Sequence, residues 1–301
     1  MDLRPLTLAE LLDRAFSTYR HHLWLFVGIM AVPAIWSITS AVAMEVFKAL
    51  TTVPGAKPGD APMQIALLLI GSFLFGIVYL LAYAFALGAT TVAVSHLYMG
   101  RETSVGAAYR AVQPHWLRLV VLLFWCWLRL FLTMMGIVAV GGVLAAIFGM
   151  ISPAFSIFFM ALAVVGGGGL CVFFVVRWGV SVPAVVLENL PARSSLARSV
   201  ELTSDNRGRT FLVILCALVI TYATVALLQV PFIVGATLAG PGTALSMLLG
   251  IVGAVLGGIG SMFSGPIMII GLAMMYYDLR IRKEAFDLQV MLDSLDAPPG
   301  S

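Results

Sequence analysis

Charged residues are scarce in this chain. Asp, Glu, Lys and Arg together make up 10% of its 301 residues, whereas soluble domains carry about 25%. Hydrophobic residues account for 61%, and the mean hydropathy is +1.05. The apolar residues come in blocks longer than the roughly 20 residues that cross a bilayer. The composition therefore excludes an ordinary soluble domain and predicts a polytopic, all-α membrane protein.

Residues that build metal centres and disulfide frameworks are also few. The cysteines lie inside apolar blocks without paired spacing; they are Cys126, Cys171 and Cys216. The histidines stand beside the ends of apolar blocks without an HExxH-type pair; they are His21, His22, His96 and His115. The chain also lacks the P-loop pattern and the G-x-S-x-G turn of hydrolases. We therefore expect neither a metal nor a cofactor.

Six apolar blocks are long enough to span a membrane. They are Leu23–Phe47, Gln64–Leu97, Trp116–Met150, Ala154–Leu187, Phe211–Ala239 and Leu245–Tyr277. Several exceed 30 residues, and tilt, a break at glycine or continuation into the headgroups would each absorb the excess. The first block is too long for the core of a cleavable signal peptide, so we expect it to remain in the mature protein.

Basic residues are distributed unevenly between these blocks. Alternate separators and the two terminal segments hold thirteen of them: Arg4, Arg14, Arg20, Arg101, Arg110, Arg118, Arg193, Arg198, Arg207, Arg209, Arg280, Arg282 and Lys283. The opposite separators hold only Lys48 and Lys57. Because basic residues accumulate in short cytoplasmic loops, this asymmetry predicts that both termini lie in the cytoplasm.

The stretch before the first block has the pattern of an amphipathic helix. Thr7 and Glu10 form a T-x-x-E capping box, which satisfies free backbone donors at a helix start. The apolar residues that follow share one helical face; they are Leu8, Leu11, Leu12, Ala15, Phe16 and Tyr19. We expect this helix to lie in the membrane interface with that face toward lipid. The alternative is a helix packed on a neighbouring loop of the protein.

The pattern recurs twice, each time before two apolar blocks. The second copy places Val105, Tyr109 and Val112 on the apolar face, and the third, fainter copy places Leu196 and Val200 there. This order of elements predicts one membrane domain over 1–301, built from three helix-hairpin units in the same orientation. The units would cover about 1–100, 101–190 and 191–285, with 286–301 as a short cytoplasmic tail.

Two arginines lie inside apolar blocks. Arg129 and Arg177 each sit about three helical turns from the cytoplasmic end of their block, where an arginine costs roughly 2.5–3.5 kcal/mol unless it faces a partner or water. Glu188 follows Arg177 by eleven residues, so the two would share one face of a helix. We expect these three residues to line a cytoplasm-facing pocket for an anionic headgroup or small acid. The alternatives are snorkelling and a structural pair with a carboxylate of another helix.

The segment after the last block contains two helical ion pairs. Asp278 and Arg282 stand at i, i+4, and so do Arg280 and Glu284. We expect a helix that leaves the membrane and ends in solvent; a partner-docking helix is the alternative.

Three segments resemble the signatures of a bacterial membrane protein family. They are PLTLAELLDRAFSTYRHH from Pro5, RWGVSVPAVVLEN from Arg177 followed by ARSSLARSVEL, and YYDLRIRKEAFDL from Tyr276. They look like those of "glycerophosphoryl diester phosphodiesterase membrane domain" proteins, named after enzymes in which such a region precedes a catalytic barrel. The resemblance implies a multi-pass protein of the bacterial inner membrane. The His-Arg pair, metal-binding carboxylates and second histidine of the barrel are not recognisable in this sequence, so we expect no phosphodiesterase activity.

These features favour a non-enzymatic membrane module, a scaffold or accessory subunit whose basic segments contact anionic lipid. The alternative is a carrier or channel for an anionic or lipid-like solute, with Arg129 and Arg177 along the route. A membrane-embedded hydrolase or transferase is the weakest hypothesis, because Glu45 is the clear acidic residue of the blocks and their central parts contain no histidine. We expect membrane lipids, anionic ones above all, and a membrane or cytoplasmic protein as partners, and no nucleic acid.

Overall fold

The computed structural model describes residues 6–51, 61–240 and 242–284, and every regular element within them is helical. The α-helices are α1 (Leu8–His21), α2 (Leu23–Thr51), α3 (Ala61–Tyr98), α4 (Val105–Val112), α5 (Trp116–Gly149), α6 (Pro153–Trp178), α7 (Ser181–Leu187), α8 (Ala192–Thr203), α9 (Arg207–Leu238) and α10 (Ala244–Glu284). Six of them, α2, α3, α5, α6, α9 and α10, are long and apolar enough to cross a membrane. The chain is thus a multi-pass, all-α membrane protein, as the sequence predicts.

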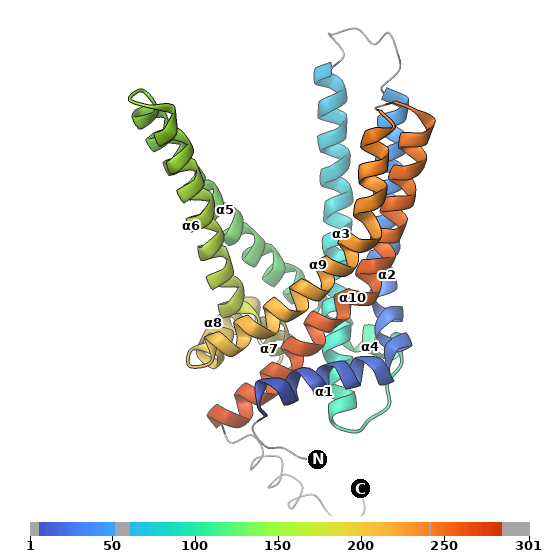
Figure 1. Ribbon diagram of the computed structural model, residues 1–301. Coiled ribbons are helices and arrows are strands. Elements are labelled where there is room, and N and C mark those ends of the chain that lie inside the picture. The colour runs from blue at the N-terminus through green and yellow to red at the C-terminus, as the bar shows by residue number, and fades with distance from the viewer. Residues whose placement is uncertain (1–5, 52–60, 241, 285–301) are drawn as a thin grey trace, which may run out of the picture.

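The long helices form two groups (Figure 1). In the first, α2, α3, α9 and α10 make a bundle in which α10 packs against each of the other three. In the second, α5 and α6 pack on each other as a hairpin that leans away from the bundle. The short helices α1, α4, α7 and α8 gather at one end of the molecule, where the last turns of α10 also lie. We call this the basic end, because the arginine-rich separators meet there.

The buried hydrophobic core of the described residues is centred on the basic end. It combines Leu11 of α1, Phe26 of α2, Val94 of α3, Val185 of α7 and Met275 of α10, all fully buried. Burial of apolar area drives this association, so the short helices are held firmly on the spans. Farther from this end, α5 and α6 expose many large apolar side chains, as surfaces that face lipid do.

A break divides the fourth apolar block, which was expected to be one helix. α6 ends at Trp178 and α7 begins at Ser181, with Val180 in a non-helical conformation between them (φ −102°, ψ 17°). Pro183 falls in the first turn of α7, where its missing N–H removes no helical hydrogen bond. The proline therefore favours a new helix start, and the break absorbs the excess length of this block.

A short helix precedes each transmembrane hairpin in the expected order: α1 before α2 and α3, α4 before α5 and α6, and α8 before α9 and α10. The capping box of Thr7 and Glu10 is formed at the start of α1. The relationship of the three units as repeats, and their boundaries, stay predictions.

The apolar faces of the short helices point into the protein. Leu11 and Ala15 of α1, Val112 of α4 and Leu196 of α8 are buried. Further residues of these faces are partly buried against the core or beside it: Leu8, Leu12, Tyr19, Val105, Tyr109 and Val200. Only Phe16 among the predicted face of α1 is exposed. The apolar face of α1 was expected to contact lipid, but the protein core covers most of it. That α1 lies at a bilayer interface stays a prediction.

Two tyrosines of the short helices bond to the backbone of spanning helices near prolines. Pro33 of α2 has no N–H, so the carbonyl of Ile29 lacks its helical partner. The hydroxyl of Tyr109, from α4, donates to this carbonyl at 2.7 Å. The hydroxyl of Tyr19 in α1 donates to the carbonyl of Phe263, three residues before Pro266 of α10. These bonds anchor α1 and α4 on the bundle.

Small residues allow close helix contacts in both groups. A Cβ added at Gly141 of α5 would lie 2.3 Å from the Cβ of Ala163 in α6. In the bundle, Gly257 of α10 faces α9, where an added Cβ would lie 2.9 Å from the amide of Gln229. Such positions let two backbones approach within a membrane.

Candidate functional site

Arg177 lies in the last turn of α6, which ends at Trp178. The expectation that Arg177 and Glu188 share one helical face is wrong, because the helix ends between them at Trp178. A helix C-terminus carries partial negative charge, which stabilises a nearby cation by about 0.3–1 kcal/mol. The position of Arg177 is therefore electrostatically favourable without a carboxylate on its own helix.

Three arginines stack on aromatic rings at the base of the α5–α6 hairpin. The Cζ atoms of Arg177 in α6 and Arg207 in α9 lie 5.2 and 5.7 Å from the ring centre of Phe173. The Cζ of Arg129 in α5 lies 5.6 Å from the ring centre of Trp178. Guanidinium groups within about 6 Å of a ring centre make cation–π contacts. We call these five residues the arginine–aromatic cluster.

None of the three arginines of this cluster forms an ion pair among the residues that the structure describes. The charge of Arg207 is felt by the exposed carboxylate of Asp205, but the two groups form no ion pair. The Nε of Arg177 is buried and has no hydrogen-bond partner. A guanidinium that stacks through its face keeps the N–H donors of its edge available, and these match phosphate and carboxylate in geometry. The cluster is therefore suited to an anion.

Glu188 belongs to a different group of residues. Its carboxylate pairs with Arg198 of α8 at 3.1 Å and accepts a hydrogen bond from the hydroxyl of Tyr276 in α10. The Nε of Arg280 lies 4.0 Å away. Glu188 thus joins α8 to α10, and its described contacts do not include the arginine–aromatic cluster. These contacts do not bring Glu188 together with Arg129 and Arg177, so they do not form the predicted three-residue pocket.

Arg198 is the centre of an ion-pair network at the basic end. Besides Glu188 it pairs with Glu284 and, at 3.5 Å, with Glu201. Burial disfavours the charged guanidinium, but the hydrogen bond to Glu284 and the charges of Glu188 and Glu284 outweigh it and raise the pKa of Arg198. Glu284 also pairs with Arg280 at 3.0 Å, which is one of the two helical pairs expected from the sequence.

Asp278 makes the other expected helical pair, with Arg282 at 2.9 Å. Its side chain is fully buried and also pairs with Arg209 of α9 at 3.1 Å. The backbone N–H of Leu6 donates to the Oδ1 of Asp278 at 2.8 Å, whereas the two arginines bond to its Oδ2. Asp278 is therefore covered by α9 and by the segment before α1, whereas Arg282 and Lys283 in the last described turn of α10 are exposed. The solvated helix end stays a prediction, because the residues after Glu284 lie outside the described part of the chain.

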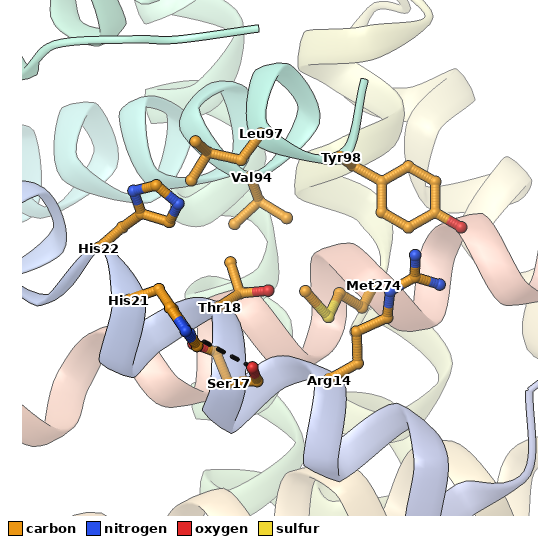
Figure 2. A pocket seen from close by; sticks show the side chains of 9 residues that line it. All are labelled: Arg14, Ser17, Thr18, His21, His22, Val94, Leu97, Tyr98 and Met274. Atoms are coloured by element: carbon orange, nitrogen blue, oxygen red, sulfur yellow. Dashed lines mark hydrogen bonds between the residues drawn. The ribbon is translucent and has the colours of Figure 1, made fainter. Parts of the chain in front are cut away.

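A cleft of about 200 Å³ lies between α1, α3 and α10, as Figure 2 shows. Arg14 extends from α1 over the ring of Tyr98, with its Cζ 5.1 Å from the ring centre. His21 and His22 line the same cleft, and the Nδ1 of His21 lies 2.7 Å from the carbonyl oxygen of Ser17. The guanidinium of Arg14 adds positive charge to the basic end.

Sequence reasoning identified two of the three arginines of the cluster and missed Arg207 and Phe173. Phe173 precedes Arg177 by four residues, the spacing of helical neighbours, so this contact was visible in the sequence. Arg207 was counted among the cytoplasmic charges, and only the packing of α9 against α6 brings it to the same ring.

No curated protein and no solved structure matches the chain. Residues 150–290 match a family model whose description is the membrane domain of glycerophosphoryl diester phosphodiesterase. The match includes the segments from Arg177 and Tyr276, whereas the segment from Pro5 lies outside it. It concerns the membrane domain and not the catalytic one. From α6 to the end of α10, the chain is therefore similar to the membrane domain of glycerophosphoryl diester phosphodiesterase, which confirms the resemblance for this part.

Proposed function

We propose that this protein is a non-enzymatic membrane module that binds anionic lipid headgroups at its basic end. The arginine–aromatic cluster carries this proposal, since Arg177 and Arg207 lie over one ring, Arg129 lies over Trp178 of the same helix end, and none of the three forms an ion pair among the described residues. The similarity to a membrane domain rather than to a catalytic domain supports the non-enzymatic role.

Stacking on Phe173 and Trp178 holds the guanidinium planes in place. Each stack is worth about 0.5–1 kcal/mol at an exposed site. A lipid phosphate between Arg177 and Arg207 would accept charge-assisted hydrogen bonds from both and reduce their mutual repulsion. Tryptophan is also enriched at the level of lipid headgroups, which agrees with the presence of Trp178 in the cluster.

The thirteen-to-two distribution of basic residues supports a cytoplasmic location of the basic end, and the family resemblance implies the bacterial inner membrane. Anionic lipids attract basic segments beside the membrane by about 1 kcal/mol per residue, and Arg14 in the cleft adds to this attraction. The ion-pair network around Arg198 makes this end a rigid surface, so we infer the role of a scaffold or accessory subunit for a membrane or cytoplasmic protein.

The test is native mass spectrometry of the full chain in mild detergent with added phosphatidylglycerol or phosphatidylcholine. We expect the wild type to retain phosphatidylglycerol and the Arg129→Gln/Arg177→Gln/Arg207→Gln variant to lose it. Arg193→Gln is the matched control, because Arg193 is exposed on α8 and outside the cluster. Equal retention by the triple variant would refute the proposal. The carrier alternative differs in requiring flux of an anionic solute into proteoliposomes.

A further inference from the structure

A cavity of about 320 Å³ lies inside the bundle of α2, α3, α9 and α10. Its lining comes from the middle parts of α3, α9 and α10 and from the region of Pro33 in α2. The lining contains six hydroxyl-bearing side chains: Ser37, Tyr79, Tyr83, Thr221, Tyr222 and Ser261. So many hydroxyl groups are unusual midway along helices that cross a hydrocarbon layer, where polar groups are costly without partners.

The hydroxyl groups of the cavity divide into two sets. Thr221 and Ser261 donate to backbone carbonyls of α10. By contrast, no hydrogen bond within the described ranges involves the side-chain hydroxyls of the other four residues, which are Ser37, Tyr79, Tyr83 and Tyr222. The Tyr79 and Tyr83 rings stack with their centres 5.8 Å apart, which fixes the rings while their hydroxyls remain available. The cavity thus presents hydrogen-bonding groups that the surrounding protein does not satisfy.

The lining also limits the charge and the route of an occupant. It contains no charged side chain, so a charged headgroup would be desolvated there without compensation. Tyr79 is 40% exposed and Tyr222 68% exposed, so the cavity is reached from the flank of the bundle through α3 and α9. In a membrane this flank faces acyl chains, which gives access from the lipid phase.

We propose that this cavity binds the uncharged polar head of a neutral glycerolipid, such as a diacylglycerol. The hydroxyl and ester oxygens lie against the three tyrosines, and the acyl chains leave between α3 and α9. The cavity has room for about ten water-sized groups at roughly 30 Å³ each, which suits a glycerol backbone with its two ester groups. This site is separate from the arginine–aromatic cluster, because the two sites share no residue.

The test uses the full chain in detergent, titrated with dioleoylglycerol and followed by native mass spectrometry. We expect one bound dioleoylglycerol per wild-type chain. The Tyr79→Phe/Tyr83→Phe/Tyr222→Phe variant keeps the rings and removes the hydroxyls, and its affinity should fall about tenfold or more because hydrogen bonds to three groups are lost. Retention of dioleoylglycerol by this variant at the wild-type affinity would overturn the proposal, and so would a wild type that binds none.

A second variant keeps the test decisive if the triple variant does not fold. Ala34 lines the cavity and is 5% exposed, so Ala34→Leu fills the space without removing a hydrogen bond. It should abolish binding of dioleoylglycerol, whereas Ala161→Leu on the exposed surface of α6 should not. Unchanged binding in Ala34→Leu would overturn the proposal. Both variants should retain phosphatidylglycerol as the wild type does, which separates this site from the arginine–aromatic cluster.

Discussion

The backbone N–H of Leu6, ahead of the first helix, donates a hydrogen bond of 2.8 Å to the Oδ1 of Asp278, near the end of the last helix. The carbonyl of Leu6 accepts hydrogen bonds from Arg209 at 2.8 Å and Arg282 at 2.6 Å. Both arginines also donate hydrogen bonds to the Oδ2 of Asp278. One buried carboxylate thus connects the beginning of the described chain with α9 and α10.

We expect Asp278→Ala to lower the free energy of unfolding by about 3 kcal/mol, because it leaves Arg209 and Arg282 without their buried counter-charge. Thermal unfolding of the purified protein in detergent measures this effect. Glu201→Ala is the control, since the Glu201 carboxylate is largely exposed and exposed pairs contribute about 0–1 kcal/mol. Equal melting temperatures of the two variants would contradict the account.

Tyr109 and Pro33 provide a second test of the fold. Tyr109→Phe removes the donor from the carbonyl of Ile29 and should cost about 1–3 kcal/mol. Pro33→Ala restores the N–H that this carbonyl lacks, so Tyr109→Phe should cost much less in that background. A double-mutant cycle on unfolding in detergent measures the coupling. Independent, additive costs would show that the tyrosine does not compensate for the proline.

The α5–α6 hairpin depends on a close contact at Gly141. An added Cβ there would lie 2.3 Å from the Cβ of Ala163, whereas nothing lies within 4 Å of a Cβ added at Gly142. Gly141→Ala should therefore destabilise the protein by about 1–3 kcal/mol. Gly142→Ala should be neutral or slightly stabilising, because alanine is the better helix former. Thermal unfolding of the two variants side by side checks this, and a more stable Gly141→Ala protein would argue against the packing.

The orientation of the basic end can be tested by cysteine labelling. The three native cysteines, Cys126, Cys171 and Cys216, are first replaced by alanine. A single cysteine is then introduced in one variant at Glu102, in the basic end, and in another at Met150, between α5 and α6. Both positions are exposed. A membrane-impermeant maleimide added to intact spheroplasts should label the cysteine at 150 and not that at 102. The reverse pattern would invert the proposed topology.

Local patterns in the sequence were sufficient for much of the fold. Hydropathy located six spans, and the spacing of Thr7 and Glu10 predicted a capping box that the structure contains. The pair of Arg280 and Glu284 was equally predictable from its helical spacing. Each of these features depends on residues within a few turns of one helix, so the sequence alone carries the information.

Features that depend on distant residues were not predictable in this way. The burial of Asp278 depends on Leu6, which is 272 positions away. The break between α6 and α7 lies inside a continuous apolar run, so hydropathy does not reveal it, although Pro183 was a local sign. The contact of Arg207 with Phe173 arises from the packing of α9 on α6. Without these contacts, sequence reasoning placed Arg177 and Glu188 on one face of a single helix, whereas the helix ends between them.

The central claim is that the arginine–aromatic cluster binds an anionic headgroup, and the dissociation constant for phosphatidylglycerol tests it most directly. The measurement compares wild type, Arg177→Gln, Arg177→Lys and Arg193→Gln by titration in mild detergent, with the melting temperature as the control for folding. Charge-assisted hydrogen bonds are worth about 1.5–3 kcal/mol, so Arg177→Gln should raise the Kd by roughly tenfold to a hundredfold. Arg177→Lys should restore only part of the affinity, because lysine lacks the planar donor fork.

The control Arg193→Gln removes the same charge from the same end of the protein, so we expect its Kd to stay within about twofold of the wild-type value, as for a single exposed charge. A Kd for phosphatidylglycerol that rises in Arg177→Gln and not in Arg193→Gln, at unchanged melting temperature, is the result that the account predicts. Equal Kd values for wild type and Arg177→Gln would contradict it.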